Sequence, residues 1–307
     1  MNRLNNYILV AFITLFTCAC SSRSQLSNQY PLPPLPEAVK IEKPICVALV
    51  LGGGGARGAA HLGVLEVLEE ANIPIDLIVG SSIGGFVGSL YADQPNSFLL
   101  KEKLMRVKRK HLTYYNPFVI RNGLWGSKSM SKFLNSNLQA KHFKDLQIPL
   151  KVVATNLLDG DEVVLSGGEI TPSVCASCAV PFYFQPVSIY GRLLVDGGVV
   201  DPVPIKVARE SNPKLVIAVD ISGTASAKRP KNMIQATKLS FQIANIQHSA
   251  NSAMDADIVI KPHIDSSISL FNHKDYEALY QSGREATKKA LPEIEKKLLE
   301  ITYLNNK

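Results

Sequence analysis

The stretch that decides the fold is "VALVLGGGGARGAAHLGVLEVLEEANIPIDLIVGSSIGG", residues Val47–Gly85. It contains two apolar runs, 45–51 and 75–80, and each ends in a glycine-rich turn that leads into a segment with helical periodicity. Short β-branched apolar runs are typical of buried parallel strands, and the helical segments after them are typical of crossover connections. The stretch therefore predicts an α/β fold with a mainly parallel central sheet flanked by helices.

The remainder of the chain continues this alternation of strands and helices. We expect strands at 150–158 and 161–167, a hairpin over 188–198 that turns at Gly191, and strands at 214–222 and 256–262. Helical periodicity predicts helices over 99–110, 128–138, 232–253 and 277–302. Because no repeat and no second linker interrupts the pattern, we expect a single domain over residues 45–307.

Composition limits the classes of function. The 307 residues are 46% hydrophobic and 19% charged, which is enough apolar material for a sizeable core. The formal charge of +7 suits contact with anionic surfaces, but no basic motif interleaved with aromatics and no zinc-finger spacing points to nucleic acid. One Cys-x-x-Cys pair, Cys175 and Cys178, has no second pair to complete a zinc site, so we interpret both as small buried residues.

The N-terminal sequence "MNRLNNYILVAFITLFTCACSSRS" is typical of an export signal. Arg3 precedes the apolar run Tyr7–Phe16, which is too short to cross about 30 Å of hydrocarbon. The end of the run resembles a bacterial lipobox, with Cys20 as the residue to be lipidated and Cys18 as a weaker site. We expect a signal peptide over 1–19 and a tether rich in Ser and Pro over 20–44.

The resemblance to a lipobox also implies a location. Ser21 after Cys20 favours the outer membrane, so we expect a lipid-anchored protein of the cell envelope that faces the periplasm. A plain secretory signal and an uncleaved anchor remain the alternatives.

The first glycine-rich turn has the spacing of a dinucleotide site, Gly53-x-Gly55-x-x-Gly58, between a strand and a helix. That site also needs an acidic residue at the end of the second strand, whereas Asp76 stands at its start. A phosphate loop of the Walker type is disfavoured as well, because no Lys-Ser or Lys-Thr pair follows the glycines. The sequence therefore disfavours nucleotide binding at this turn and indicates another function for it.

The second turn, Gly80-Ser81-Ser82-Ile83-Gly84, matches G-x-S-x-G at a strand-to-helix junction. Its glycines allow a sharp turn that presents Ser82 at a helix N-terminus, where free amides and the helix dipole favour negative charge. Ser82 is thus the candidate nucleophile, and Ser81 is the rival that lacks the central position of the motif.

A serine nucleophile gives the first turn a different function. The amides of Gly53, Gly54 and Gly55 end a neighbouring strand and can face an oxyanion formed by attack of Ser82. Arg57, in the first turn of the following helix, either braces this loop, meets a phosphate or lies on the surface.

Ser82 also needs a base. Asp196 follows a strand and precedes Gly197 and Gly198, which allow the backbone to approach closely. An α/β-hydrolase would use a histidine further along the chain, and of His248, His263 and His273 the best candidate is His263. We interpret His61 as a packing or surface residue.

Four segments together resemble the patatin-like phospholipases, in a bacterial lipoprotein form. They are "GGGGARG" (52–58), "GSSIG" (80–84), "SCAVPFYFQPV" (177–187) and "DGG" (196–198), within a region of resemblance over 47–220. The resemblance implies a Ser–Asp dyad without histidine, in which Ser82 is the nucleophile, Asp196 the base and Gly53–Gly55 the oxyanion hole. It gives supporting roles to Arg57, Gly58, Gly80, Gly84, Gly197 and Gly198, and it implies no metal and no cofactor. Asp201 departs from the family, whose members often carry Asn there.

The resemblance further implies hydrolysis of fatty-acyl esters of phospholipids or lysophospholipids. The basic run 101–111 is a candidate contact for an anionic bilayer, and residues 114–126 are a candidate wall of an acyl groove. Two alternatives stay open, which are a Ser–Asp–His esterase of the α/β-hydrolase type and a non-catalytic envelope lipoprotein.

Overall fold

The computed structural model describes residues 32–105, 114–115, 125–181, 183–224, 229–264 and 275–305. The expected signal peptide and Cys20 lie outside these residues. A compact unit runs from Pro34 to the C-terminus, so it begins before the predicted start near Pro44. The N–H of Val39, for example, donates to the carbonyl of Ser166 at 3.0 Å. The last part of the expected tether is therefore packed against the domain.

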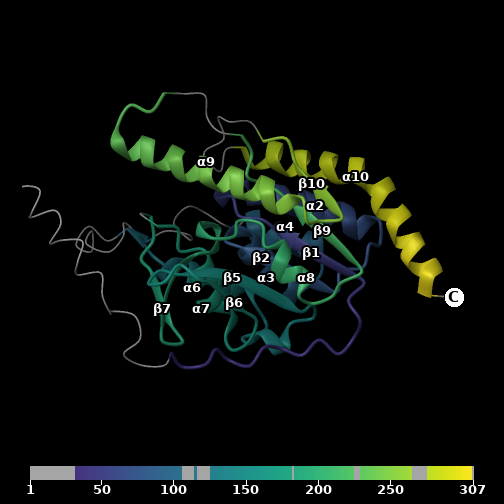
Figure 1. Ribbon diagram of the computed structural model, residues 1–307, viewed down its shortest axis with the longest axis horizontal. Coiled ribbons are helices and arrows are strands. Elements are labelled where there is room, and N and C mark those ends of the chain that lie inside the picture. Colours follow the sequence, from purple (N-terminus) through teal and green to yellow (C-terminus); the bar gives the residue numbers. More distant parts are fainter. Residues whose placement is uncertain are drawn as a thin grey trace, which may run out of the picture. The chain divides into compact units, whose positions relative to one another are not determined.

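An eight-stranded sheet forms the centre of this unit (Figure 1). Its order is β10-β9-β1-β2-β5-β8-β7, and β6 pairs with β5 beside this path. The pairs from β10 to β5 are parallel, whereas β6, β7 and β8 are added antiparallel, which confirms the mainly parallel sheet. The strands are β1 (Val47–Leu51), β2 (Leu77–Ser81), β5 (Leu150–Asn156), β6 (Glu162–Leu165), β7 (Val187–Ile189), β8 (Arg192–Asp196), β9 (Leu215–Val219) and β10 (Ile258–Ile260).

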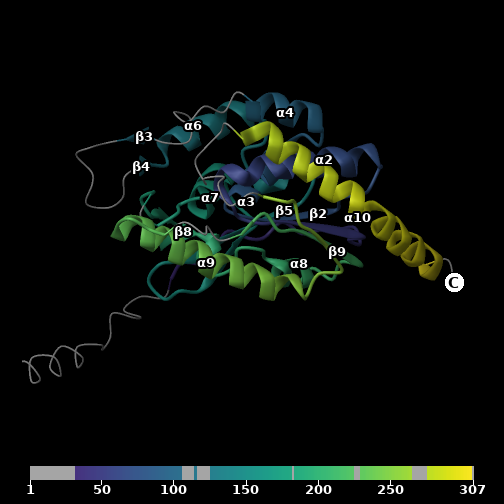
Figure 2. The same cartoon turned by 90° about the horizontal axis from the view of Figure 1, so that it is seen from above.

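Helices cover both faces of the sheet, as Figure 2 shows with the sheet between α2, α3 and α10 on one side and α8 on the other. The helices are α2 (Ala59–Glu70), α3 (Ile83–Asp93), α4 (Ser97–Met105), α6 (Lys128–Asn137), α7 (Ile170–Ser177), α8 (Ile205–Arg209), α9 (Met233–Ala253) and α10 (Tyr276–Asn305), with single 3-10 turns η1 (Gly55–Gly58), η3 (Phe143–Asp145) and η4 (Gly197–Val199). The expected α/β fold is confirmed.

The core follows from the alternation of side chains along buried strands. In β1, Val47, Leu49 and Leu51 join the larger cluster under α2, α3 and α10. Ala48 and Val50 of the same strand join a smaller cluster with the apolar residues of α8. Because both faces of β1 are buried, the strand has the continuous apolar sequence from which it was predicted.

Some elements differ from the sequence-based prediction. Helices α7 and α8 were not predicted, since α7 carries Pro172 in its first turn and α8 has only five residues. The predicted helix over 99–110 begins earlier, as α4, and residues 106–110 lie outside the described part. Of the predicted acyl-groove segment 114–126, the structure describes only the ladder of β3 (Tyr114–Tyr115) and β4 (Trp125–Gly126).

Two observations bear on contact with a bilayer. In the basic run, Lys103 pairs with Asp93 at 3.8 Å, and the Nζ atom of Lys101 lies 4.2 Å from the ring centroid of Tyr280, so both have partners within the fold. Across the described residues, no helix is both long enough and apolar enough to cross a bilayer.

Candidate active site

Ser82 occupies a strained turn between β2 and α3. Its φ of 52° and ψ of −123° lie outside the regions that non-glycine residues ordinarily adopt, as expected for a nucleophile elbow. Glycine is required on either side, because a Cβ at Gly84 would collide with the carbonyl of Leu51 and one at Gly80 would lie 2.5 Å from the amide of Gly85. Both supporting glycines of the predicted motif thus permit the tight packing of the turn.

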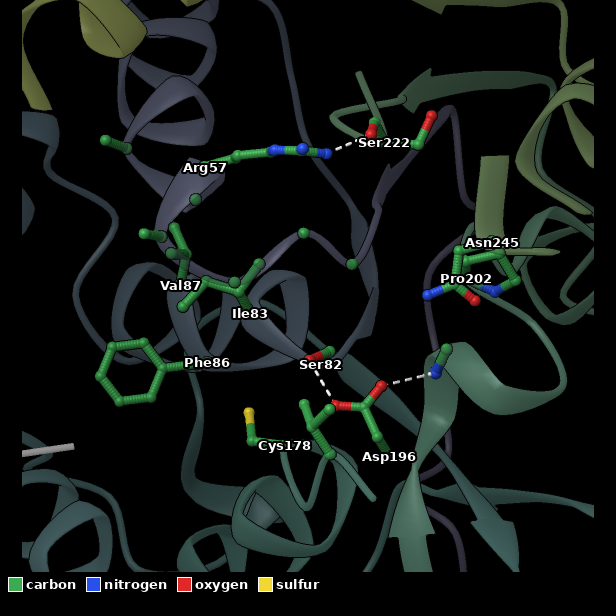
Figure 3. A pocket seen from close by; sticks show the side chains of 18 of the residues that line it. Arg57, Ser82, Ile83, Phe86, Val87, Cys178, Asp196, Pro202, Ser222 and Asn245 are labelled. Atoms are coloured by element: carbon green, nitrogen blue, oxygen red, sulfur yellow. Dashed lines mark hydrogen bonds between the residues drawn. The ribbon is translucent and has the colours of Figure 1, made fainter. Parts of the chain in front are cut away.

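The side chains of Ser82 and Asp196 meet in a short hydrogen bond (Figure 3). The Ser82 hydroxyl donates to Oδ2 of Asp196 at 2.6 Å, and the N–H of Gly198 donates to Oδ1 of the same carboxylate at 2.8 Å. The carboxylate is therefore held from both sides, by the hydroxyl that it faces and by the turn that follows it.

The sheet explains why two residues so far apart in sequence meet. β5 pairs in parallel with β2 and antiparallel with β8, so the ends of β2 and β8 lie at one edge of the sheet. The hydroxyl of Thr155 in β5 donates to the Asp196 carbonyl at 2.8 Å. Gly197 must be small, because a Cβ there would lie 2.7 Å from Oγ of Ser81 and would collide with the carbonyl of Val153.

Burial changes the acid strength of the candidate base. Asp196 is only 3% exposed, and desolvation raises its pKa from 3.8 to about 7, although the hydrogen bonds from Ser82 and Gly198 lower it. A carboxylate with such a pKa accepts a proton at neutral pH far more readily than an ordinary Asp does.

The glycine-rich loop faces the same point, but its three amides are not equivalent. The N–H of Gly53 donates to the carbonyl of Pro202 at 2.8 Å, so this predicted oxyanion donor already has a partner. Within the described chain, the N–H groups of Gly54 and Gly55 have no hydrogen-bond partner. Asp201, the departure from the family pattern, accepts from the N–H of Val203 at 3.2 Å and so shapes the segment that holds Gly53.

His61 holds the start of this loop. It is fully buried, its Nε2 lies 2.8 Å from the carbonyl of Gly52, and burial lowers its pKa to about 4. The ring is therefore neutral, and we assign the tautomer in which Nε2–H donates to Gly52. This buried packing role agrees with one of the two roles considered from the sequence.

Arg57 is not a surface residue. Its side chain is 2% exposed, and its guanidinium donates to the carbonyl of Ser222, across the cavity from Ser82 in Figure 3. It thus braces the loop, one of the roles considered from the sequence. Gly58 lets this loop lie against the elbow, since a Cβ there would collide with Ile83.

Ser177 is a positioning residue that the motif search did not assign. Its hydroxyl accepts from the Ser82 N–H at 2.8 Å and donates to the Val153 carbonyl at 2.6 Å, which fixes the elbow to β5. The resemblance in "SCAVPFYFQPV" contained this serine, so the signal was present without its role. Cys175 and Cys178 beside it are free and buried, as interpreted from the sequence.

Ser82 and Asp196 open into a cavity of about 360 Å³. One wall is mainly apolar and includes Ile83, Phe86, Val87, Met130, Val180 and Phe184. This apolar lining suits an acyl chain.

The histidines considered as bases do not face this cavity. His248 and His263 are exposed and do not line it, and His273 lies outside the described residues. Ser81, the rival nucleophile, is fully buried in β2 and is also absent from the lining. The geometry thus pairs Ser82 with Asp196 rather than with a histidine.

Comparison with known proteins agrees with this architecture. The family model described as patatin-like phospholipase matches residues 49–209, which include the glycine-rich loop, the elbow and Asp196. The chain belongs to the patatin-like phospholipase family. VipD from Legionella pneumophila has a similar fold, with a TM-score of 0.53 and 15% identity over 88% of this chain and 72% of that one.

Curated relatives match the same region. The human patatin-like phospholipase domain-containing protein 6 is 35% identical over 182 residues, which are 57% of this chain and 13% of that protein. An uncharacterized NTE family protein of Mycobacterium tuberculosis is 35% identical over 58% of this chain and 49% of its own length. Lysophospholipase NTE1 of Cryptococcus neoformans is 36% identical over 65% of this chain and 13% of its own length. The chain thus spans only a fraction of these relatives.

The raised pKa of Asp196 predicts a pH-dependent effect of Asp196→Asn on stability. Between its unfolded pKa near 3.8 and its folded pKa near 7, the folded state binds the proton more tightly. The stability that this carboxyl contributes is therefore present at low pH and is lost as the pH rises to 7. We expect the difference in Tm, variant minus wild type, to grow from pH 5 to pH 7 and then to level off, as measured by calorimetry. A difference that stays constant over this range would contradict the raised pKa.

Proposed function

We propose that the protein is a serine acyl hydrolase that cleaves fatty-acyl esters of phospholipids or lysophospholipids through the dyad of Ser82 and Asp196. The observation that carries the proposal is the 2.6 Å hydrogen bond between the Ser82 hydroxyl and the buried Asp196 carboxylate at the edge of an apolar cavity. A buried base within hydrogen-bonding distance of a hydroxyl on a strained elbow is the arrangement that activates a serine nucleophile.

In the first half of the reaction, Ser82 Oγ attacks the ester carbonyl while Asp196 takes the hydroxyl proton. The carbonyl oxygen becomes an oxyanion, which the amides of Gly54 and Gly55 stabilise because they have no partner among the described residues. The carbonyl then re-forms, the ester bond breaks, and Asp196 returns the proton to the departing alcohol. In the second half, Asp196 takes a proton from water as the water attacks the acyl-enzyme carbonyl. The bond to Ser82 Oγ then breaks, the fatty acid leaves, and Asp196 returns the proton to Ser82, which restores the free enzyme.

The lipid substrate is supported by two features. The apolar wall beside Ser82 suits an acyl chain, and burial of a chain there is favourable in proportion to the apolar area removed from water. The fungal relative is named a lysophospholipase. A Ser–Asp–His esterase is less favoured, since no histidine among the described residues lines the cavity.

Ser82→Ala and Asp196→Asn should each lower the rate of ester hydrolysis by three orders of magnitude or more. Ser82→Ala should also lose labelling by a fluorophosphonate probe. Initial rates with acyl esters and gel-based labelling measure these effects, and circular dichroism checks the fold. His263→Ala is the control and should retain the wild-type rate, because its side chain is exposed away from the cavity. Full turnover in both dyad variants, or a large loss in His263→Ala, would refute the dyad.

The pH profile of kcat/KM should show one ascending limb with an apparent pKa of about 7. The base must be ionised to act, so the rate should fall tenfold for each pH unit below 7 and reach a plateau above it. Measurement between pH 5 and pH 9 tests this. A rate that stays level down to pH 5 would mean that Asp196 keeps an ordinary pKa.

The location of the protein is a separate proposal, because it rests on residues outside the described part. We expect Cys20 to carry a lipid that anchors the domain to the cell envelope, at the periplasmic face of the outer membrane. Cys20→Ser, expressed in a bacterium that exports lipoproteins, should move the protein from the membrane fraction to the soluble fraction and abolish incorporation of a clickable fatty acid. If fractionation and labelling stay unchanged in Cys20→Ser, Cys20 is not the residue that anchors the protein.

A further inference from the structure

The cavity beside Ser82 has two unlike walls. Besides the apolar residues, the cavity is lined by polar residues of three elements, which we call the polar wall: Arg57 of η1, Ser222 after β9, and Gln242, Asn245 and Ser249 of α9. Figure 3 shows Asn245 and Phe86 on opposite sides of the cavity, with Ser82 between them. An acyl chain accounts for the apolar wall only.

Helix α9 presents an unusual face to this cavity. Gln242, Asn245 and Ser249 follow one another at helical spacing, so they share the side of α9 that faces inward. The inward stripe of a surface helix is ordinarily apolar. Among the α9 side chains that the structure describes, Ser249 alone is buried. α9 also lies beyond the matched residues 49–209, so the family match gives it no role.

Several polar groups of this wall have no partner in the described structure. They are the side-chain amide of Asn245, the hydroxyls of Ser222 and Ser249, and Nε of Arg57. Ser249 and Arg57 are almost completely buried, at 0% and 2% exposure. Buried polar groups without a hydrogen bond cost stability, and they are few in native proteins. Three such buried groups, on Arg57, Ser222 and Ser249, lie around one cavity together with the half-buried Asn245 amide, which indicates a polar ligand.

The charge of the wall indicates that the ligand is an anion. Asp220, the acidic residue nearest to Ser222, pairs with Lys261 at 3.0 Å and accepts from the Ser222 N–H at 2.9 Å. Asp220 thus interacts with both Lys261 and the buried guanidinium of Arg57, and Arg57 supplies the positive charge among the polar residues that line the cavity. The other groups of the wall can donate N–H or O–H bonds, which suits phosphate oxygens.

We propose that α9 and the facing residues Arg57 and Ser222 form a head-group subsite, in which the Asn245 amide donates to the phosphodiester of a phospholipid or lysophospholipid. This inference rests on the proposed function, since it assigns the leaving alcohol of the same reaction to the polar wall. Asn245 is close to the dyad as well, because a Cβ on Gly198 would lie 3.7 Å from its Nδ2. The subsite therefore discriminates phosphodiester esters from neutral acylglycerols.

The test compares two substrates with the same acyl ester on glycerol, lysophosphatidylcholine and monoacylglycerol. Asn245→Leu keeps the number and branching of the side-chain heavy atoms and removes the donor. It should lower kcat/KM for lysophosphatidylcholine by about tenfold, mainly through KM, and leave monoacylglycerol unchanged. Asn251→Leu, an exposed position of the same helix, is the matched control and should alter neither substrate. Fluorophosphonate labelling of all three proteins reports on Ser82 independently of the head group.

Competition separates a lipid head group from free phosphate. Glycerophosphocholine should inhibit the wild type competitively and inhibit Asn245→Leu more weakly, whereas inorganic phosphate should inhibit neither at the same concentration. Equal losses on both substrates, or inhibition by inorganic phosphate as strong as by glycerophosphocholine, would overturn the subsite and leave the dyad intact. Absence of both labelling and turnover in the wild type would instead overturn the proposed function.

Discussion

The structure depends on one constraint, which is that a carboxylate must sit beside a hydroxyl where water is largely excluded. Asp196 and Ser82 are 3% and 7% exposed, and the 2.6 Å bond between them joins the ends of two strands that are not neighbours in the sheet. β5 between them supplies the register. Its Thr155 hydroxyl donates to the Asp196 carbonyl, and its Val153 carbonyl accepts from the Ser177 hydroxyl, which in turn accepts from the Ser82 N–H. The cost of burying the carboxylate appears directly in its raised pKa.

The fold and the residues that form the hydrogen-bonded pair Ser82 and Asp196 left local signals in the sequence. Continuous apolar runs marked β1 and β2, and G-x-S-x-G at a strand-to-helix junction marked Ser82. Asp196 was marked by the glycines after it, which the close approach to Val153 and Ser81 requires. Each of these signals is a short stretch of chain whose own backbone geometry demands particular residues.

Features that depend on partners distant in sequence were not predictable in this way. Nothing around Gly53 indicates that its N–H is taken by Pro202, and nothing around Arg57 indicates that it is buried against Ser222. Ser177 lies in a segment that the family resemblance marked, but its role became clear only from its hydroxyl, which lies between Ser82 and Val153. The polar inward stripe of α9 likewise acquires meaning only from the cavity that it faces.

The bond from Gly53 to Pro202 has a consequence for how the protein can change. Pro202, six residues after Asp196, accepts the hydrogen bond from the Gly53 N–H. The next two amides of this loop, those of Gly54 and Gly55, have no partner among the described residues. In the proposed reaction, one continuous stretch, 196–203, would therefore position both the base and the loop that stabilises the oxyanion. Substitutions there would alter both together, so their effects should be strongly non-additive with changes in the glycine loop. A substitution that changes the base without the glycine loop, or the loop without the base, would have to lie in α2, α7 or α9 instead.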